Sequence, residues 1–520
     1  MATLPTQRIL IVGGGSAGWL CAAYLAKMFG ASKEITLVEA PEIGAIGVGE
    51  GSFPSLRSTL AALGIPEAQF VREASATFKQ GITFRHWLNG EDSYFHPFSL
   101  PSQRQGVPEL LPYWLQGLAG ATPFAQAVTM QKRVTDARRA PKRAGDGDYS
   151  GAMNYAYHFD AARFAGLLAR HARSLGVRHV QDHVEGALLT EDGAIASVKT
   201  REHGALEADL YIDCSGFRAL LIGTALGSPF RSVSDTLFCD TALAVQVPYP
   251  APDTPIASAT ISTAHEAGWT WDIGLQERRG IGYVYSSRHS SDARAEQVLR
   301  AYAGAAADGL NVRKIAMRVG YREQHWIKNC VAIGLSGGFL EPLEASGIGL
   351  VETAVQMLGA LFPHNGDMAP LARHFNHFMR ERYARIVDFL KLHYCLSQRS
   401  EAFWRDNADP ASWPDGLRDK LAMWRCRPPQ RLDFLTDVEM YPPSSWQYVL
   451  YGMGFERAMP PLPGLAPLAA VAQQEFANIA RFAERAVADL PDHRAFVDQL
   501  CCHENAFRKD FHTIHATPGR

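Results

Sequence analysis

The stretch that decides the fold is Arg8–Trp19, RILIVGGGSAGW, near the start of the chain. The apolar run Ile9–Val12 predicts a buried strand, and Gly13, Gly15 and Gly18 follow it in a G-x-G-x-x-G frame. The first glycine permits a tight turn, the second lets backbone approach a phosphate, and the third lets the next helix pack on the strand. The stretch therefore predicts a dinucleotide-binding unit.

The residues that follow also fit the order of elements in a dinucleotide-binding unit. Trp19–Ala26 reads as a helix, and Glu34–Val38 reads as a second strand that ends at Glu39, where a carboxylate can bond ribose hydroxyls. A chance glycine turn is the alternative, but strand, turn, helix and acid all fall in place. The glycine-rich segment Ile43–Gly51 then indicates backbone that passes close to a ligand.

Composition narrows the class of protein. The chain has 520 residues, 47% hydrophobic and 20% charged, which is typical of a globular protein with two to four domain-sized units. A net charge of -2 gives no sign of a nucleic-acid or membrane partner. The eight cysteines include no C-x-x-C pair, so neither a disulfide framework nor a metal site is indicated. The first residues, MATLPTQR, lack a signal-peptide core, and we expect a cytoplasmic protein.

Two later segments, Ala208–Gly216 and Asn329–Gly334, again read as strands that end at glycine. We therefore expect an α/β fold in which a Rossmann-type domain with inserted β-sheet segments occupies residues 1–362. Beyond it, residues 363–520 have mainly helical patterns separated by prolines, and we expect a helical region that covers the substrate pocket.

Three segments carry unusual side chains. Thr77–Phe84 reads as one strand with Lys79 set among apolar residues, where a snorkelling surface lysine is the ordinary interpretation. Trp269 and Trp271 alternate on one strand face, which core packing alone would explain. Glu341–Gly347 places two acids before a helix, and its free backbone N–H groups form a natural anion site.

Taken together, GGGSAGW, TFKQGI, WTWDI and FLEPLEASGI resemble the flavin-dependent halogenases, the group that includes the tryptophan halogenases. The similarity runs from Arg8 to about Trp404, where HYCLSQRSEAFW also resembles the family. It implies an enzyme that uses FADH2 from a separate flavin reductase, dioxygen and chloride or bromide to form hypohalous acid. Hypohalous acid would then halogenate an electron-rich, indole-like aromatic by electrophilic substitution.

The resemblance also implies residue roles. Lys79 matches the essential lysine that orients hypohalous acid or holds it as a haloamine, and Glu344 matches its partner glutamate. The halide would bind at Ser346 and Gly347, and Trp269 and Trp271 would separate substrate from flavin. FAD would bind at Gly13, Gly15, Ser16, Ala17, Gly18, Glu39, Ala45, Gly47, Val48, Gly49 and Gly334.

The sequence departs from the family at two places. Gly274 stands where W-x-W-x-I-P has proline, and Thr436–Trp446 lacks the paired-tyrosine, glutamate and Phe–Trp set that clamps free tryptophan. His96 and Phe98 resemble residues that flank the substrate ring, so an indole or another electron-rich arene is still favoured.

Three alternatives stay open. A FAD-dependent aromatic monooxygenase would share the cradle but would not need Lys79 with Glu344. A halogenase that acts on a carrier-bound aromatic would use the basic run Lys132–Arg143, which otherwise reads as an exposed loop, and a homodimer is also open. A flavin-binding protein without chemistry is disfavoured because both Lys79 and Glu344 are present.

Overall fold

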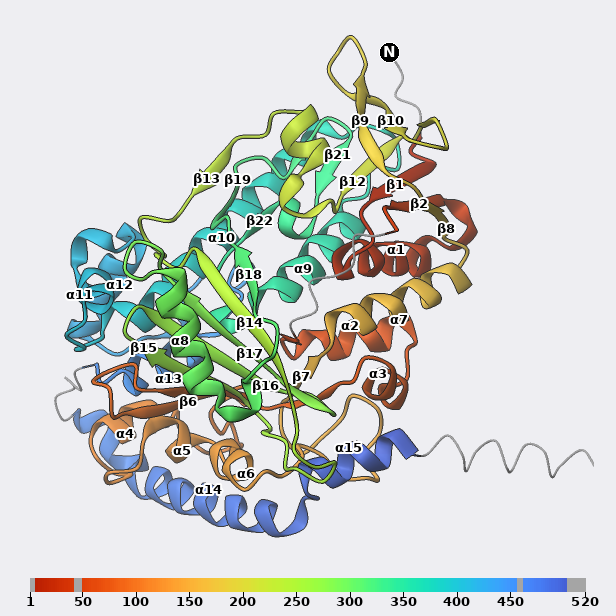
Figure 1. Ribbon diagram of the computed structural model, residues 1–520. Helices are drawn as coiled ribbons and strands as arrows, with labels where there is room; N and C mark the ends of the chain where they lie inside the picture. The colour runs from red at the N-terminus through yellow and green to blue at the C-terminus, as the bar shows by residue number, and fades with distance from the viewer. Residues whose placement is uncertain (1–4, 42–48, 456–461, 503–520) are drawn as a thin grey trace, which may run out of the picture.

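The computed structural model describes residues 5–41, 49–455 and 462–502 (Figure 1). It confirms the predicted strand, glycine turn, helix and second strand as β1 Arg8–Val12, α1 Ser16–Phe29 and β2 Glu34–Glu39. The α/β architecture and the helical C-terminal region are confirmed as well (Figure 1).

A six-stranded sheet holds β1 near its centre. Val12 at the end of β1 pairs with Val38 of β2 on one side and with Asp213 on the other, and both pairings are parallel. The carboxyl ends of these strands therefore meet at one edge, where parallel sheets bind ligands. The strands, in spatial order, are β20 Trp326–Ile327, β21 Cys330–Ala332, β12 Leu210–Asp213, β1, β2 and β8 Arg178–Gln181.

A seven-stranded, mostly antiparallel sheet is inserted into this domain, and it carries the two predicted tryptophans. Its order is β18 Arg313–Ala316, β14 Thr241–Pro248, β17 Arg278–Tyr285, β16 Gly268–Gly274, β15 Thr260–His265, β5 Gly81–Arg85 and β6 Ser93–Pro97. A small sheet beside it consists of β3 Glu50–Gly51, β7 Ala156–Phe159 and β4 Thr77–Lys79. Two further three-stranded sheets contain β9 Val184–Leu189, β10 Ile195–Thr200 and β11 Ala205–Leu206, and β13 Phe230–Ser232, β19 Gly320–Arg322 and β22 Gly338–Phe339.

The prediction of one continuous strand over Thr77–Phe84 is wrong. The chain leaves the small sheet after Lys79 and enters the seven-stranded sheet at Gly81. Gly81 has a φ of 153°, and a Cβ there would lie 2.4 Å from the carbonyl oxygen of His96. Only glycine fits this change of sheet, and Lys79 is consequently the last residue of its strand.

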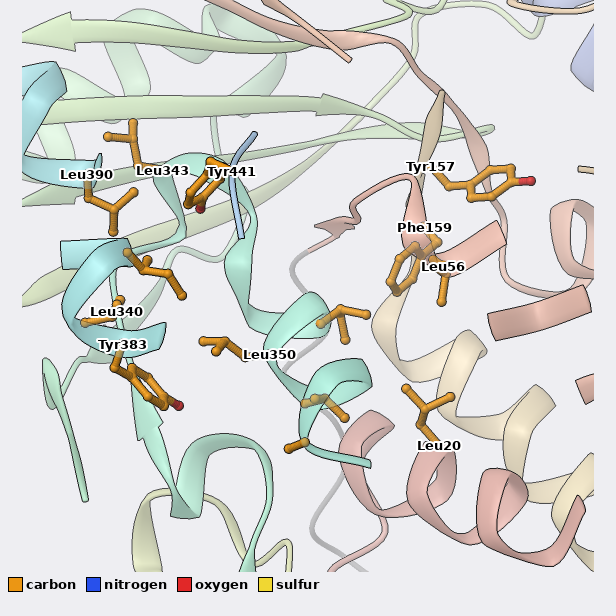
Figure 2. Close-up of a cluster of buried hydrophobic side chains, with 14 of the residues drawn as sticks. Leu20, Leu56, Tyr157, Phe159, Leu340, Leu343, Leu350, Tyr383, Leu390 and Tyr441 are labelled. Atoms are coloured by element: carbon orange, nitrogen blue, oxygen red, sulfur yellow. The ribbon is translucent and has the colours of Figure 1, made fainter. Parts of the chain in front are cut away.

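The helix α9, Ser346–Ala360, packs between the Rossmann-type part of the core and the C-terminal helices. Figure 2 shows its Leu350 between Leu20 of α1 on one side and Tyr383 of α10, Ala369–Cys395, on the other. Because α9 begins two residues after Glu344, this packing fixes the segment that carries the predicted anion site.

The C-terminal helices wrap around the seven-stranded sheet, with α14 along one edge of the molecule (Figure 1). They are α10 Ala369–Cys395, α11 Ala402–Ala408, α12 Asp415–Cys426, α13 Pro443–Gly452, α14 Ala469–Asp489 and α15 His493–Cys502. The earlier helices, besides α1 and α9, are α2 Ser55–Leu63, α3 Glu67–Glu73, α4 Leu111–Leu115, α5 Phe124–Val128, α6 Gln131–Asp136, α7 Ala161–Ser174 and α8 Asp292–Ala303. None of the helices in the described ranges is long and apolar enough to span a bilayer.

Candidate active site

The glycine turn after β1 leaves the N-terminus of α1 facing open space. Gly13 has a φ of 111°, and a Cβ there would lie 2.3 Å from the carbonyl oxygen of Cys214. A Cβ on Gly18 would lie 1.9 Å from the carbonyl oxygen of Gly13, so the helix packs directly on the turn. At Gly15, in contrast, a Cβ would meet nothing within 4 Å. The first N–H groups of α1 therefore face room for an anion such as a pyrophosphate.

A cavity of about 480 Å³ opens in front of this turn. Glu39 lies in its wall, and its Oε1 is 2.8 Å from Nε2 of His179. Burial raises the pKa of Glu39, and His179 opposes that shift. An open helix N-terminus and an acid at the end of β2, both at the carboxyl edge of a parallel sheet, fit FAD.

Most of the predicted cofactor residues line this cavity. They are Gly13, Gly15, Ser16, Ala17, Glu39, Gly49 and Gly334. Gly18 is instead buried between α1 and the turn, and Ala45, Gly47 and Val48 lie outside the described residues. Sequence reasoning did not name the lining residues Glu50, Cys214, Arg218 and Tyr383. Glu50 and Cys214 lie in the segments Ile43–Gly51 and Ala208–Gly216, which it had noted, whereas Arg218 and Tyr383 come from segments that it did not assign to the cofactor.

Lys79 lies in the wall of the same cavity and is only 1% exposed, so the snorkelling interpretation is wrong. Among the described residues, no oxygen accepts a hydrogen bond from its Nζ, which lies 5.2 Å from the ring centre of Phe98. A Cβ built on Gly51 would lie 3.0 Å from Nζ and 3.5 Å from the Cβ of Ala345. Burial lowers the pKa of Lys79 to about 8, although Glu344 opposes that shift.

Glu344, one residue before Ala345, is 1% exposed and is held by two imidazoles. Its Oε1 lies 2.9 Å from Nδ1 of His96 and 2.9 Å from Nε2 of His393. Burial alone would raise its pKa, but the two histidines outweigh burial and hold the pKa at about 2. The predicted lysine and glutamate thus meet in one buried place although 265 positions, 344 minus 79, separate them in the chain.

The predicted halide residues begin helix α9. Ala345 precedes the helix with a φ of 57°, and its conformation turns the chain into the first helical residues, Ser346 and Gly347. Both line the cavity, and a Cβ on Gly347 would meet nothing within 4 Å. Backbone N–H groups without intrahelical partners therefore face the cavity at this helix start.

The predicted tryptophan pair lies on β16, with ring centres 6.4 Å apart. Trp271 lines the cavity, whereas Trp269 lies deeper and packs against Trp87 at 6.1 Å. The facing residue on β17 is Gly282, where a Cβ would lie 2.1 Å from the Trp271 indole. A glycine on the neighbouring strand therefore makes the space that the cavity-lining indole occupies.

Comparison with known proteins settles the family. The tryptophan halogenase family model matches residues 8–466. The chain belongs to the tryptophan halogenase family. This halogenase is 36% identical to tryptophan 6-halogenase SttH of Streptomyces toxytricini, over 94% of its own length and 98% of that protein. The tryptophan halogenase structure from Shewanella frigidimarina is 41% identical, with a TM-score of 0.91, 96% of this chain and 98% of that chain covered. BrvH, a flavin-dependent halogenase from Brevundimonas sp. BAL3, is 35% identical with a TM-score of 0.86, covering 95% and 99%.

The protein is therefore an enzyme, a flavin-dependent halogenase that acts on an indole-like aromatic. The family uses FAD, halide and dioxygen, with a separate flavin reductase and a small aromatic substrate. No cluster of three metal-ligating side chains occurs in the part of the chain that the structure describes.

The basic run Lys132–Arg143 is not the exposed loop that the sequence predicted. Its first half belongs to α6, where Lys132 pairs with Asp136. Lys142 is 3% exposed, and its Nζ lies 2.5 Å from Oε2 of Glu67. Several of the cations have partners inside the molecule, and the observation that suggested a carrier-protein surface is correspondingly weaker.

Two residues beside the predicted pair were not assigned by sequence reasoning. His393 of α10 contacts Glu344, and Ser445 of α13 lies with its Oγ 2.8 Å from Nε2 of His96. His393 opens the stretch HYCLSQRSEAFW, which carried the resemblance but no assigned role. Ser445 falls in Thr436–Trp446, where the search for a tryptophan clamp did not consider a contact to His96.

Proposed function

We propose that this halogenase acts on indole or a similar electron-rich arene rather than on free tryptophan. The support comes from Thr436–Trp446, whose aromatic residues pack inward. Tyr441 stacks on Phe389 with ring centres 3.9 Å apart, and Trp446 is fully buried against the same ring at 5.0 Å. Side chains committed to the core do not clamp an amino acid, whereas SttH, by name, acts on tryptophan.

The observation that carries the reaction is the convergence of Lys79 and Glu344 in a buried place beside the cavity. FAD, when bound and reduced, would supply the activated oxygen that converts halide into hypohalous acid. Lys79 then presents the halogen to the arene, by a hydrogen bond or as a haloamine. Glu344, ionised because its pKa is held at about 2, takes the proton that the ring loses.

Other residues prepare this step. Backbone N–H groups at Ser346 and Gly347 hold the halide where α9 begins. His96 orients Glu344 through Nδ1, and Phe98 lies beside Nζ of Lys79 at the substrate side. Trp269 and Trp271 keep the arene away from the flavin, which disfavours hydroxylation.

The two-part division of the chain enters the same proposal. Residues 1–362 form the FAD-binding halogenase domain, and residues 363–520 form a helical region that covers the substrate pocket. The support is that His393 from α10 and Ser445 from α13 reach the pair Glu344 and His96.

Mass spectrometry tests the proposal. Indole is incubated with the enzyme, FAD, a flavin reductase with NADH, and either chloride or bromide. We expect a halogenated indole that is lost in Lys79→Ala, while FAD binding, measured by flavin fluorescence, is kept. Lys132→Ala, which removes a lysine from α6, serves as the control and keeps full activity.

Each other outcome has a definite meaning. Oxygenated indole would make the enzyme a monooxygenase. Turnover of tryptophan in preference to indole would overturn the substrate proposal. Halogenation by Lys79→Ala would remove the lysine from the reaction.

A further inference from the structure

His393 has a fixed partner at each ring nitrogen. Nδ1 lies 3.0 Å from the backbone carbonyl oxygen of Phe389, one turn earlier in α10, and Nε2 lies 2.9 Å from Oε1 of Glu344. The side chains of His393 and Glu344 are both 0% exposed. Neither side chain is exposed to bulk solvent, so the hydrogen bonds within the protein decide where the protons are.

The carbonyl oxygen of Phe389 can only accept, and Nδ1 must therefore carry a proton. If Glu344 is ionised, it can also only accept, and Nε2 must carry a second proton. His393 is then an imidazolium. His96 differs because its Nε2 meets the hydroxyl of Ser445, which can donate or accept, so its hydrogen bonds do not require a proton on both ring nitrogens.

We propose that His393 is the buried cation that neutralises Glu344, and that Lys79 can thereby lose its proton and face the cavity as an uncharged amine. Without such a cation, the carboxylate beside it would hold Lys79 in the ammonium form. Burial lowers the pKa of Lys79 to about 8 although Glu344 opposes that shift, so about a tenth of Lys79 is already the uncharged amine at pH 7. His393 is a positioning residue here, since it acts on Lys79 only through Glu344.

The remaining groups around the two side chains leave the balance of charge intact. Burial keeps the pKa of His158, which lies one strand away from Lys79 in the small sheet, well below the usual value, so it is neutral. Tyr94 and Tyr441 face Glu344, and burial raises the pKa of both hydroxyls well above the usual value. His393 is thus the group beside Glu344 whose hydrogen bonds require a charge.

An uncharged amine selects one of the two roles proposed for Lys79. Its nitrogen lone pair attacks the halogen of hypohalous acid, the N–X bond forms, and the O–X bond breaks. One amine proton leaves with the hydroxide as water. The arene then takes the halogen from the haloamine, and its own ring proton, which Glu344 accepts, restores the amine. This inference rests on the proposed function for its chemistry, but its test needs no turnover.

The test measures the protonation of Lys79 directly. The full chain, without added flavin or halide, is trace-labelled with acetic anhydride from pH 6 to 10.5, and the Lys79 peptide is quantified by mass spectrometry. In wild type we expect a labelling midpoint near the pKa of about 8. In His393→Gln, whose amide still donates to Glu344 but carries no charge, the midpoint rises by at least about one pH unit, a tenfold change.

Two further variants make the result decisive. In Glu344→Gln both charges of the pair vanish, and the midpoint stays within about half a pH unit of wild type. His325→Gln, at a buried histidine that stacks on Tyr383, leaves the midpoint unchanged and controls for disturbance of the core. An unchanged midpoint in His393→Gln, or a fall of more than a unit in Glu344→Gln, would show that Lys79 itself is the counter-ion and would overturn the inference. Loss of halogenation alone would bear on the proposed function instead.

Discussion

Two carboxyl groups on one short segment, those of Glu341 and Glu344, are equally buried, and yet their pKa values are shifted in opposite directions. They are 0% and 1% exposed, and only two residues separate them. Burial raises the pKa of Glu341 to about 7, whereas the pKa of Glu344 is held at about 2. The two surroundings differ in the partners that they offer, not in their exposure to water.

The partner atoms explain the difference. Glu341 accepts a hydrogen bond from the Tyr394 hydroxyl at 2.8 Å, and its Oε1 has no hydrogen-bond partner among the described residues. Glu344 meets two imidazoles, one of which carries a charge under the inference above. Neutral donors do not repay the desolvation of a carboxylate, while a cation does. The segment therefore supplies one acid suited to remain neutral and one base suited to accept a proton.

The largest expected difference between Glu341 and Glu344 is their effect on catalysis. Glu344→Gln removes the base, and we expect indole halogenation to fall by about a hundredfold or more. Glu341→Gln replaces a carboxyl that stays protonated below its pKa of about 7 by a neutral amide, and keeps activity within about threefold. Halogenated indole is measured by mass spectrometry, and release of hypohalous acid, trapped by a thiol, is kept in both variants. Equal losses of activity in the two variants would show that Glu344 has no catalytic role that Glu341 lacks.

The next effect is on stability. His393→Phe leaves the Glu344 carboxylate without one partner of a buried ion pair, and we expect a loss of about 3–5 kcal/mol in the free energy of unfolding. His325→Phe is the matched control. His325 is buried, both of its ring nitrogens have no hydrogen-bond partner among the described residues, and its ring stacks on Tyr383 at 5.3 Å. Urea unfolding measures both, and similar losses would contradict a special role for the ion pair.

The sequence allowed much of this to be predicted, because some features are local. The glycine frame after β1 and the segment before α9 act through consecutive backbone groups, so their geometry can be predicted from the order of the residues. The partners of Glu344 cannot be predicted in this way. His96 and His393 come from β6 and α10, and nothing in the local pattern of either tells which carboxylate it contacts.

Two other failures have the same physical origin. The passage of the chain from one sheet to another at Gly81 depends on the carbonyl oxygen of His96 in the neighbouring strand. Lys142 belongs to a run of cations that reads as solvated, but Glu67 of α3 draws it into the interior. In both cases a contact between distant segments overrides the local pattern, and a single sequence does not show such contacts.

The comparison also predicts pH dependences of opposite sign. The pKa of Glu341 is raised from 4.5 in the unfolded chain to about 7, so the unfolded state loses its proton first and the free energy of unfolding falls as pH rises from 4.5 to 7. The pKa of Glu344 is lowered to about 2, so the stability that it contributes is present above pH 4.5 and is lost as pH falls toward 2.

Glu341→Gln removes the first of these dependences. Relative to wild type, we expect the variant to gain about 3 kcal/mol between pH 4 and pH 8, which corresponds to a shift of roughly 2.5 pKa units. Glu344→Gln serves as the matched comparison, since its deficit relative to wild type shrinks as pH falls from 4.5 toward 3. Urea unfolding across this range measures both. A constant difference between wild type and Glu341→Gln would mean that Glu341 is ionised in the folded protein.

The smallest effect concerns the hydroxyl that serves Glu341. Tyr394→Phe keeps the buried ring, which packs on Trp87 at 5.3 Å, and removes the only hydrogen bond that the described residues donate to Oε2 of Glu341. An unpaired buried acceptor costs about 1–3 kcal/mol, and this loss is smaller than that of an uncompensated charge. Because the hydroxyl favours the ionised carboxylate, its removal raises the pKa of Glu341 further and extends the fall in stability to higher pH.

Tyr283→Phe, at a buried tyrosine whose hydroxyl has no hydrogen-bond partner among the described residues, is the control and has no such pH signature. If Tyr394→Phe left that pH range unchanged, the hydroxyl would not be what moderates the pKa of Glu341, and Trp269 and Cys239 would carry that role.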